Sequence, residues 1–408
     1  MTDLSSFRYI ANAQSRKRET DDSADNFITQ DVIQKVRNFH QSFHEYRITP
    51  LHRLQQLSRR LNVQQIWVKD ESYRFGLNAF KALGGTYAIA QYLATKLRLD
   101  LTEISFATLK SNEMKEHLGH LTFVTATDGN HGKGIAWAAK ELDQKAVVFL
   151  PKGSSRIRVQ NIMNEGAEAI VTDLNYDDTV RFAKDYADRN NGVFIQDTSW
   201  NGYEEIPTWI TQGYCTLMDE AMEQIEAANE EHPTHVFLQA GVGSFAASGV
   251  GYLVAKYGTF RPITVIVEPD KAACIYQSMV INDGKPHAVT GNMPTMMAGL
   301  ACGEPSALAW GILRSYADAS IACPDHVSAK GMRILGNPLP GDPQVISGES
   351  GAVGLGVLSL IQETPELQGV AEQLHIDANS RVLLINTEGD TDPESYRNIV
   401  WNGNHPSL

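Results

Sequence analysis

The sequence has few cysteines, no basic stripe and no long apolar run. Its 48 acidic and 35 basic residues give a net charge of −13, which argues against binding to nucleic acid or to an anionic membrane. No segment approaches the length of a membrane span, and residues 1–23 lack the apolar core of a signal peptide. We therefore expect a cytoplasmic protein without membrane or nucleic-acid partners.

The four cysteines follow neither a CxxC pattern nor any metal-binding spacing. Buried free thiols are the simplest expectation for an intracellular chain, although one disulfide between Cys274 and Cys302 stays open. Asp390 and Asp392 lack a third ligand at a suitable spacing, so we expect no metal.

The 408 residues are enough for two domains, and apolar strands alternate with helices along most of the chain. This alternation predicts an α/β fold of parallel sheets that are buried on both faces. The pattern restarts near residue 201. We therefore expect two open, twisted α/β domains with a cleft between them. The large domain would comprise residues 1–88 and 202–408, with 1–48 as an N-terminal extension that packs on it, and residues 89–201 would form a smaller inserted domain.

Lys81 occupies an unusual position in the segment FGLNAFKALGGTYA. It precedes a predicted helix, whose N-terminus already carries partial positive charge. A solvated surface lysine is the simplest explanation. A lysine that must lose its proton to react would instead benefit from this position, because desolvation and the helix terminus both lower an amine pKa.

The loop Gly241–Ser244 follows an apolar strand and opens a helix. Such a loop binds phosphate through backbone amides and the helix dipole. The same stretch also fits G-x-G-x-x-A, and Glu268 ends the next strand, so dinucleotide binding is an alternative at this point. Tight packing alone would also explain the glycines.

Three further loops each allow an ordinary structural explanation. In residues 127–132 (TDGNHG), Asp128 or Asn130 could cap a helix, and His131 is expected to be a structural turn residue. Residues 347–352 (SGESGA) and 386–390 (NTEGD) could be simple turns.

Taken in order, these segments resemble the fold-type II pyridoxal-phosphate enzymes, which include threonine and serine dehydratases, serine racemase and cysteine synthases. The ordered set is Phe80-Lys81 with two following glycines, GNHG, the Gly-rich loop, ESGA and a hydroxyl residue after the last strand. The resemblance covers about residues 51–392.

Within that family, FGLNAFKALGG and ATDGNHGKG look like the diaminopropionate ammonia-lyases. Dehydratases usually have arginine where this chain has Leu83 and alanine where it has Gly85. The spacing from Lys81 to Asn130 is also longer than in dehydratases, because a polar insert lies between the two residues. The resemblance thus implies elimination from D- and L-2,3-diaminopropionate to give pyruvate and two ammonia, with a serine/threonine dehydratase or a cysteine-derivative eliminase as the alternative.

The resemblance implies roles for the cofactor-binding residues. Lys81 would hold pyridoxal 5'-phosphate as a Schiff base, Asn130 would face its hydroxyl, and Phe80 would pack beside its ring. Either Thr387 or Glu388 would contact the pyridine nitrogen. The remaining residues implied by the resemblance are those of the phosphate loop and the ESGA segment: Gly241, Val242, Gly243, Ser244 and Gly351.

Substrate binding is assigned by the same resemblance to Thr127, Asp128, Gly129 and Asp197. Asp128 stands where related enzymes have a small or hydroxyl residue, and a carboxylate is a stronger base. We expect Lys81 to take the α-proton of the L-substrate and Asp128 that of the D-substrate. Asp197 would hold the β-ammonium or support Asp128, although a turn residue would explain it too. The family is usually homodimeric.

Two further alternatives remain at this point. A nicotinamide dehydrogenase built on the Gly241 loop and Glu268 would leave Lys81 dispensable. A catalytically inactive binding protein would retain only the fold, but the intact Lys81, Asn130 and Gly-rich loop argue against it.

Overall fold

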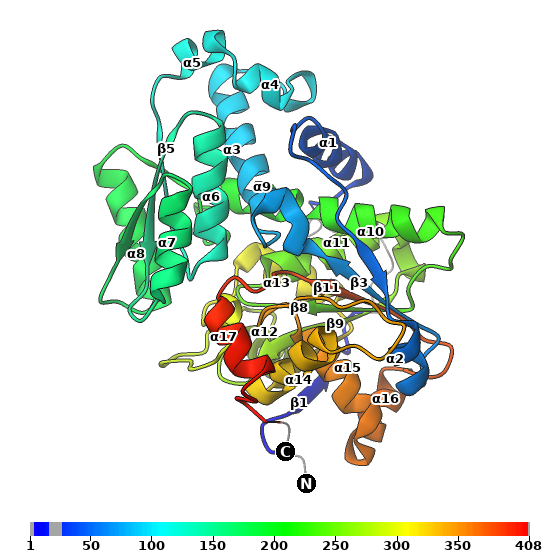
Figure 1. Cartoon of the computed structure of the whole chain (residues 1–408). Helices are drawn as coiled ribbons and strands as arrows, with labels where there is room; N and C mark the ends of the chain where they lie inside the picture. The colour runs from blue at the N-terminus through cyan, green and yellow to red at the C-terminus, as the bar shows by residue number, and fades with distance from the viewer. Residues whose placement is uncertain (1–3, 16–26, 407–408) are drawn as a thin grey trace.

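The computed structural model describes residues 4–15 and 27–406, which form two β-sheets covered by helices (Figure 1). The larger sheet has the strand order β1-β10-β9-β8-β11-β3-β2 and the smaller β6-β5-β4-β7. This confirms the predicted α/β class with two open sheets. The strands are β1 (Arg8–Ala11), β2 (Leu51–Arg53), β3 (Gln65–Asp70), β4 (Thr122–Ala126), β5 (Lys145–Leu150), β6 (Glu168–Val171), β7 (Val193–Phe194), β8 (His235–Gln239), β9 (Ile263–Pro269), β10 (Ala319–Cys323) and β11 (Arg381–Asn386).

The expectation of purely parallel sheets was wrong at both edges of the larger one. β1 pairs antiparallel with β10, and β2 pairs antiparallel with β3. Edge strands are free to run either way because no crossover helix fixes their direction. The pairing of β1 with β10 also attaches the described part of the N-terminal extension to the larger sheet.

Helices cover both faces of the larger sheet (Figure 1). On one face lie α10 (Cys215–Ala227), α11 (Ser244–Tyr257) and α13 (Ala307–Tyr316), and on the other α14 (Asp325–Gly336) and α15 (Val353–Glu363). Side chains alternate accordingly along β8: Val236 and Leu238 join the first core, and Phe237 the second. Such a doubly covered parallel sheet places its loops at the carboxyl ends of the strands.

The helix that follows Lys81 is α3 (Ala82–Leu97), which packs against α6 (Asn130–Glu141) and α9 (Glu205–Gly213). The two glycines after Lys81 make this packing close. A Cβ on Gly84 would lie 2.6 Å from Cε1 of Tyr214, and one on Gly85 would lie 2.8 Å from Cδ1 of Ile135. The glycine pair therefore serves helix packing.

The remaining helices complete the covering layers. Two consecutive helices follow the smaller sheet, because α9 ends before Tyr214 and α10 begins after it. The others are α1 (Gln30–Gln41), α2 (Gln55–Arg60), α4 (Phe106–Leu109), α5 (Asn112–Leu118), α7 (Arg156–Asn164), α8 (Tyr176–Arg189), α12 (Cys274–Ile281), α16 (Gln368–Gln373) and α17 (Pro393–Val400), with short 3-10 turns η1 (Glu71–Gly76), η2 (Leu101–Glu103), η3 (Gly258–Phe260), η4 (Ala298–Leu300) and η5 (Pro365–Leu367).

The predicted domain boundary between residues 88 and 89 falls inside α3, and the division of the chain into two domains remains a prediction. Across residues 4–15 and 27–406, no helix combines the length and the apolar character needed to cross a membrane. The four cysteines are buried free thiols, so Cys274 and Cys302 are not bridged.

Candidate active site

Lys81 is held at the N-terminus of α3 by the loop that follows β11. The amide of Phe80 donates to the carbonyl of Thr387 at 3.1 Å, and the amide of Gly389 donates to the carbonyl of Asn78 at 3.1 Å. Asn78 to Lys81 thus lie beside the carboxyl end of β11, where ligands bind in open parallel sheets.

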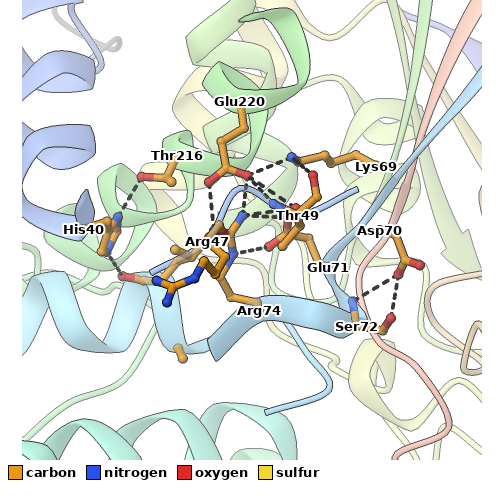
Figure 2. A network of polar contacts seen from close by, with 12 residues as sticks. His40, Arg47, Thr49, Lys69, Asp70, Glu71, Ser72, Arg74, Thr216 and Glu220 are labelled. Atoms are coloured by element: carbon orange, nitrogen blue, oxygen red, sulfur yellow. Dashed lines mark hydrogen bonds and ion pairs between the residues drawn. The ribbon is translucent and has the colours of Figure 1, made fainter. Parts of the chain in front are cut away.

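A buried ionic network anchors the segment before Lys81 (Figure 2). Glu220 on α10 accepts from Lys69 Nζ at 2.7 Å and from Arg74 Nη2 at 2.8 Å, while Arg74 Nε donates to Glu71 at 2.8 Å. These side chains have no solvent exposure. The network fixes η1 at a bend where Phe75 has a left-handed φ of 50°, and that bend directs the chain toward Lys81.

The Lys81 ammonium pairs with Asp197, with 2.6 Å between Nζ and Oδ2. Burial of Lys81 favours the neutral amine, but the negative groups around it, Asp197 first among them, together outweigh burial and raise the pKa of the lysine. The expectation that its surroundings lower this pKa was therefore wrong, because it considered the helix terminus and desolvation without the facing carboxylate. The same pairing lowers the pKa of the buried Asp197.

The loop before α6 turns Asp128 toward Lys81. Neither Asp128 nor Asn130 caps the helix: the hydroxyl of Thr127 instead accepts from the amides of Gly129 and Gly132 at 2.9 and 3.0 Å. Burial raises the pKa of Asp128 despite the opposing charges of Arg158 and Lys81. A raised pKa makes its carboxylate a stronger base.

Asn130 is oriented by a buried carboxyl group. Its side-chain Nδ2 donates to Glu388 Oε2, and the amide of Ser350 donates to Glu388 Oε1 at 3.0 Å. Burial, and next the charge of Glu349, raise the pKa of Glu388 to about 7. Glu388 is thus already engaged with Asn130 and Ser350.

Thr387 retains a free donor. Its hydroxyl oxygen accepts from Gln239 Nε2 at 3.1 Å, so its proton can be donated to an acceptor in the cavity, such as a pyridine nitrogen. This arrangement supports Thr387 over Glu388 as the partner of that nitrogen.

The Gly-rich loop after β8 also lines the cavity, at the start of α11. Gly243 has a left-handed φ of 98°, and a Cβ on Gly241 would lie 3.1 Å from Sγ of Cys302. Glycine is favoured at both positions, at Gly243 by the backbone conformation and at Gly241 by the close approach of its neighbours. The first amides of α11 have no preceding turn to bond to, as an anion site requires.

One cavity collects most of the residues singled out in the sequence. It contains about 660 Å³ of space, part of it open to solvent, and its predicted lining residues are Phe80, Lys81, Asp128, Asn130, Asp197, Gly241, Val242, Gly243, Ser244 and Thr387. Thr127, Gly129 and Gly351 are not among the lining residues. Thr127 lies beneath its loop, and a Cβ on Gly351 would lie 2.3 Å from Oδ1 of Asn386.

Several lining residues were not predicted from the sequence as functional. They are His131, Tyr176, Gln239, Cys302 and Ser350. Tyr176 and Cys302 come from segments without any motif, so only the fold identifies them. His131 and Ser350 belong to the TDGNHG and SGESGA segments, in which neighbouring residues were predicted to be functional.

Glu268 would bind the ribose if the Gly241 loop bound a dinucleotide, but its carboxylate already accepts hydrogen bonds from other residues. Its carboxylate accepts from the amides of Ile275 and Tyr276 at 2.8 and 2.7 Å and from Ser320 Oγ at 3.1 Å. It caps the start of α12 in the protein interior, so it is not available to bind a ribose.

The cavity fits pyridoxal phosphate. A lysine reaches into it, a helix N-terminus with small residues lies on one side, and Thr387 offers a donor on another. The buried hydroxyl of Ser350 has no partner among the described residues, as expected of a wall that contacts a polar ligand.

Comparison with known proteins agrees with this geometry. Residues 43–387 match the family described as pyridoxal-phosphate dependent enzymes. The chain is 53% identical over 397 residues to diaminopropionate ammonia-lyase of Salmonella typhimurium, covering 97% of this chain and 98% of that one. It is 53% identical over 378 residues to the Escherichia coli enzyme, covering 93% of each.

Solved structures of the Escherichia coli enzyme superpose closely on the chain. The complex with D-serine has a TM-score of 0.91 at 49% identity, and that with an aminoacrylate-PLP azomethine reaction intermediate has 0.89 at 48%; each comparison covers 98% of both chains. Maize serine racemase, at 19% identity and a TM-score of 0.68, shares the fold. The chain belongs to the fold-type II pyridoxal-phosphate dependent enzymes and, within them, to the diaminopropionate ammonia-lyase family of carbon-nitrogen lyases.

Proposed function

We propose that this chain converts D- and L-2,3-diaminopropionate and water to pyruvate and two ammonia. Membership of the ammonia-lyase family supports this activity. The observation that carries it is that Lys81 lines one cavity together with two carboxylates, Asp128 and Asp197. A dehydratase acting on a neutral hydroxyl has less need of two carboxylates there than an enzyme whose substrate carries two ammonium groups.

The residues around the cavity would hold pyridoxal phosphate. Lys81 would bind it covalently, the loop of Gly241 to Ser244 would bind its phosphate, and Asn130 and Thr387 would contact its ring substituents. When bound, the cofactor supplies an electron sink that stabilises negative charge at the substrate Cα. Phe80 packs against the rings of Tyr214 and Phe245, which supports a role in closing one side of the ring site.

Lys81 and Asp128 would act as bases for opposite enantiomers. For the L-substrate the α-proton would pass to Lys81 Nζ, and for the D-substrate to the Asp128 carboxylate. The Cα–H electron pair then forms the new Cα–Cβ double bond as the Cβ–N bond breaks. A β-ammonium departs as neutral ammonia and takes that bond's electron pair. Once released, 2-aminopropenoate reacts with water to give pyruvate and the second ammonia.

Asp197 would keep the β-nitrogen protonated until it departs. This role matters because an amide ion is far too basic to leave. Asp197 is buried and has a lowered pKa, so its carboxylate is ionised at neutral pH. Thr127 and Gly129 support substrate binding indirectly, since their hydrogen bond shapes the loop that carries Asp128.

We also propose a cytoplasmic homodimer with a small domain over residues 89–201 and a large domain formed by the rest. The composition of the chain supports the location, and the family resemblance supports the dimer. The separate sheet formed by β4 to β7 supports the domain division.

The direct test measures pyruvate release by the purified holoenzyme. D- and L-diaminopropionate should both be turned over with higher kcat/KM than D- or L-serine. Turnover of serine without turnover of diaminopropionate would contradict the proposal and indicate a dehydratase.

A further inference from the structure

Two buried acceptor atoms in the cavity receive no hydrogen bond from any other described residue. They are Nδ1 of His131 and Oδ1 of Asp197, two residues that are 3% and 2% exposed. Buried polar atoms are nearly always paired in folded proteins, and each exception calls for an explanation. Both residues line the cavity of Lys81, so a ligand rich in donors would satisfy them.

The tautomer of His131 is fixed by the backbone. Its Nε2 lies 3.1 Å from the carbonyl oxygen of Ile195, which can only accept, so Nε2 carries the proton. Burial lowers the pKa of His131, so the ring is neutral at pH 7 and Nδ1 presents a lone pair. His131 is therefore an acceptor within the cavity and not a cation.

Asp197 presents its second acceptor from the same segment. Its Oδ2 is paired with Lys81 at 2.6 Å, and Oδ1 is unpaired. Ile195, which anchors the imidazole, precedes it by only two residues. Burial lowers the pKa of His131, and the charge of Asp197 offsets only part of that lowering. One short segment therefore anchors the imidazole and also carries the unpaired carboxylate oxygen.

We propose that His131 Nδ1 and Asp197 Oδ1 together receive the side-chain ammonium of the substrate and thereby select 2,3-diaminopropionate. A primary ammonium carries three donors, a hydroxyl one and a methyl group none. Asp128, which also lines the cavity, supplies an acceptor for the third donor. The proposal rests on the proposed function and assigns specificity to a residue, His131, that the sequence suggested was structural.

A matched pair of variants separates the acceptor from the backbone contact. In His131→Asn the side-chain oxygen lies near the place of Nδ1, so an acceptor remains while the bond to Ile195 is lost. In His131→Gln the amide reaches the carbonyl of Ile195, but the acceptor at Nδ1 is lost. A merely structural histidine would be replaced better by glutamine, and a specificity-determining one by asparagine.

The experiment measures KM and kcat for diaminopropionate in the wild-type holoenzyme and in both variants. The inhibition constant of alanine, which has no β-nitrogen, is measured in the same three proteins as a control. His131→Gln should raise KM for diaminopropionate by about tenfold or more and leave the alanine constant unchanged, while His131→Asn should keep KM within about threefold of wild type. An unchanged KM in His131→Gln, or an equal weakening of alanine binding, would overturn the inference. Failure of the wild-type enzyme to turn over diaminopropionate would instead contradict the proposed function.

The wild-type holoenzyme provides a test that needs no folded variant. In 2-aminobutyrate a methyl group replaces the ammonium. Its inhibition constant should exceed the KM for diaminopropionate by about tenfold or more, because both acceptors then stay unpaired. If 2-aminobutyrate binds as tightly as diaminopropionate, the cavity gains nothing from the second ammonium and the inference is wrong.

Discussion

The ammonium of Lys81 lies 2.6 Å from the carboxylate of Asp197, in a cavity where both side chains are largely removed from solvent. Through this pair, Asp197 affects two functions: the attachment of the cofactor to Lys81 and the binding of the substrate. A free lysine amine must lose its proton before it can attack a cofactor aldehyde, and Asp197 opposes that loss. The same carboxylate is available to the substrate once the lysine is engaged.

Replacing Asp197 with asparagine should change cofactor attachment and catalysis in opposite directions. Without the carboxylate charge the pKa of Lys81 falls, and at neutral pH the free-amine fraction rises about tenfold for each unit of that fall. Attachment of pyridoxal phosphate, followed by its absorbance, should therefore be faster. Elimination should slow by about a hundredfold or more. A surface control, Asp188→Asn, should change neither, and unchanged attachment kinetics in Asp197→Asn would contradict the electrostatic argument.

The ionic network before Lys81 should be essential to stability. Glu220→Ala leaves Lys69 and Arg74 buried without their shared carboxylate, and breaking a buried pair in this way costs about 3–5 kcal/mol. Urea unfolding monitored by circular dichroism measures the loss. As a control, Asp188→Ala removes an exposed ion pair with Lys184 and should change the free energy of unfolding by less than about 1 kcal/mol. Equal effects would show that the network adds no stability.

Glu388 should make the protein less stable as the pH rises. Its pKa is about 7 in the folded chain, because of burial and then Glu349, and about 4.3 when unfolded. Its contribution is therefore complete below about pH 4.3 and is lost as the pH approaches 7, because only the unfolded chain releases the proton over that interval.

Urea unfolding at pH 5 and pH 8 tests this linkage in Glu388→Gln. The difference in unfolding free energy between the two pH values should shrink relative to wild type. It should not vanish, because the buried Glu268 also has a pKa of about 7 and is unchanged. A pH dependence identical to that of wild type would contradict the assignment.

The sequence predicted the fold and most of the cavity because the Gly-rich loops and Lys81 have fixed places at strand and helix ends. No alternation or motif marks the edge strands β1 and β2, which have only four and three residues. The sequence also misjudged the pKa of Lys81, because the partner Asp197 is 116 residues away. Tyr176 and Cys302 reach the cavity through tertiary packing, which no local pattern reports.

The most direct test of the mechanism is the activity of Asp128→Asn on each enantiomer of 2,3-diaminopropionate, measured as pyruvate release by the holoenzyme. Loss of a positioned base lowers rates by about a hundredfold or more. The account predicts such a loss in kcat for the D-enantiomer, with much smaller change for the L-enantiomer, whose proton passes to Lys81. Equal retention of both activities, or equal loss of both, would contradict the assignment of Lys81 and Asp128 as bases for opposite enantiomers.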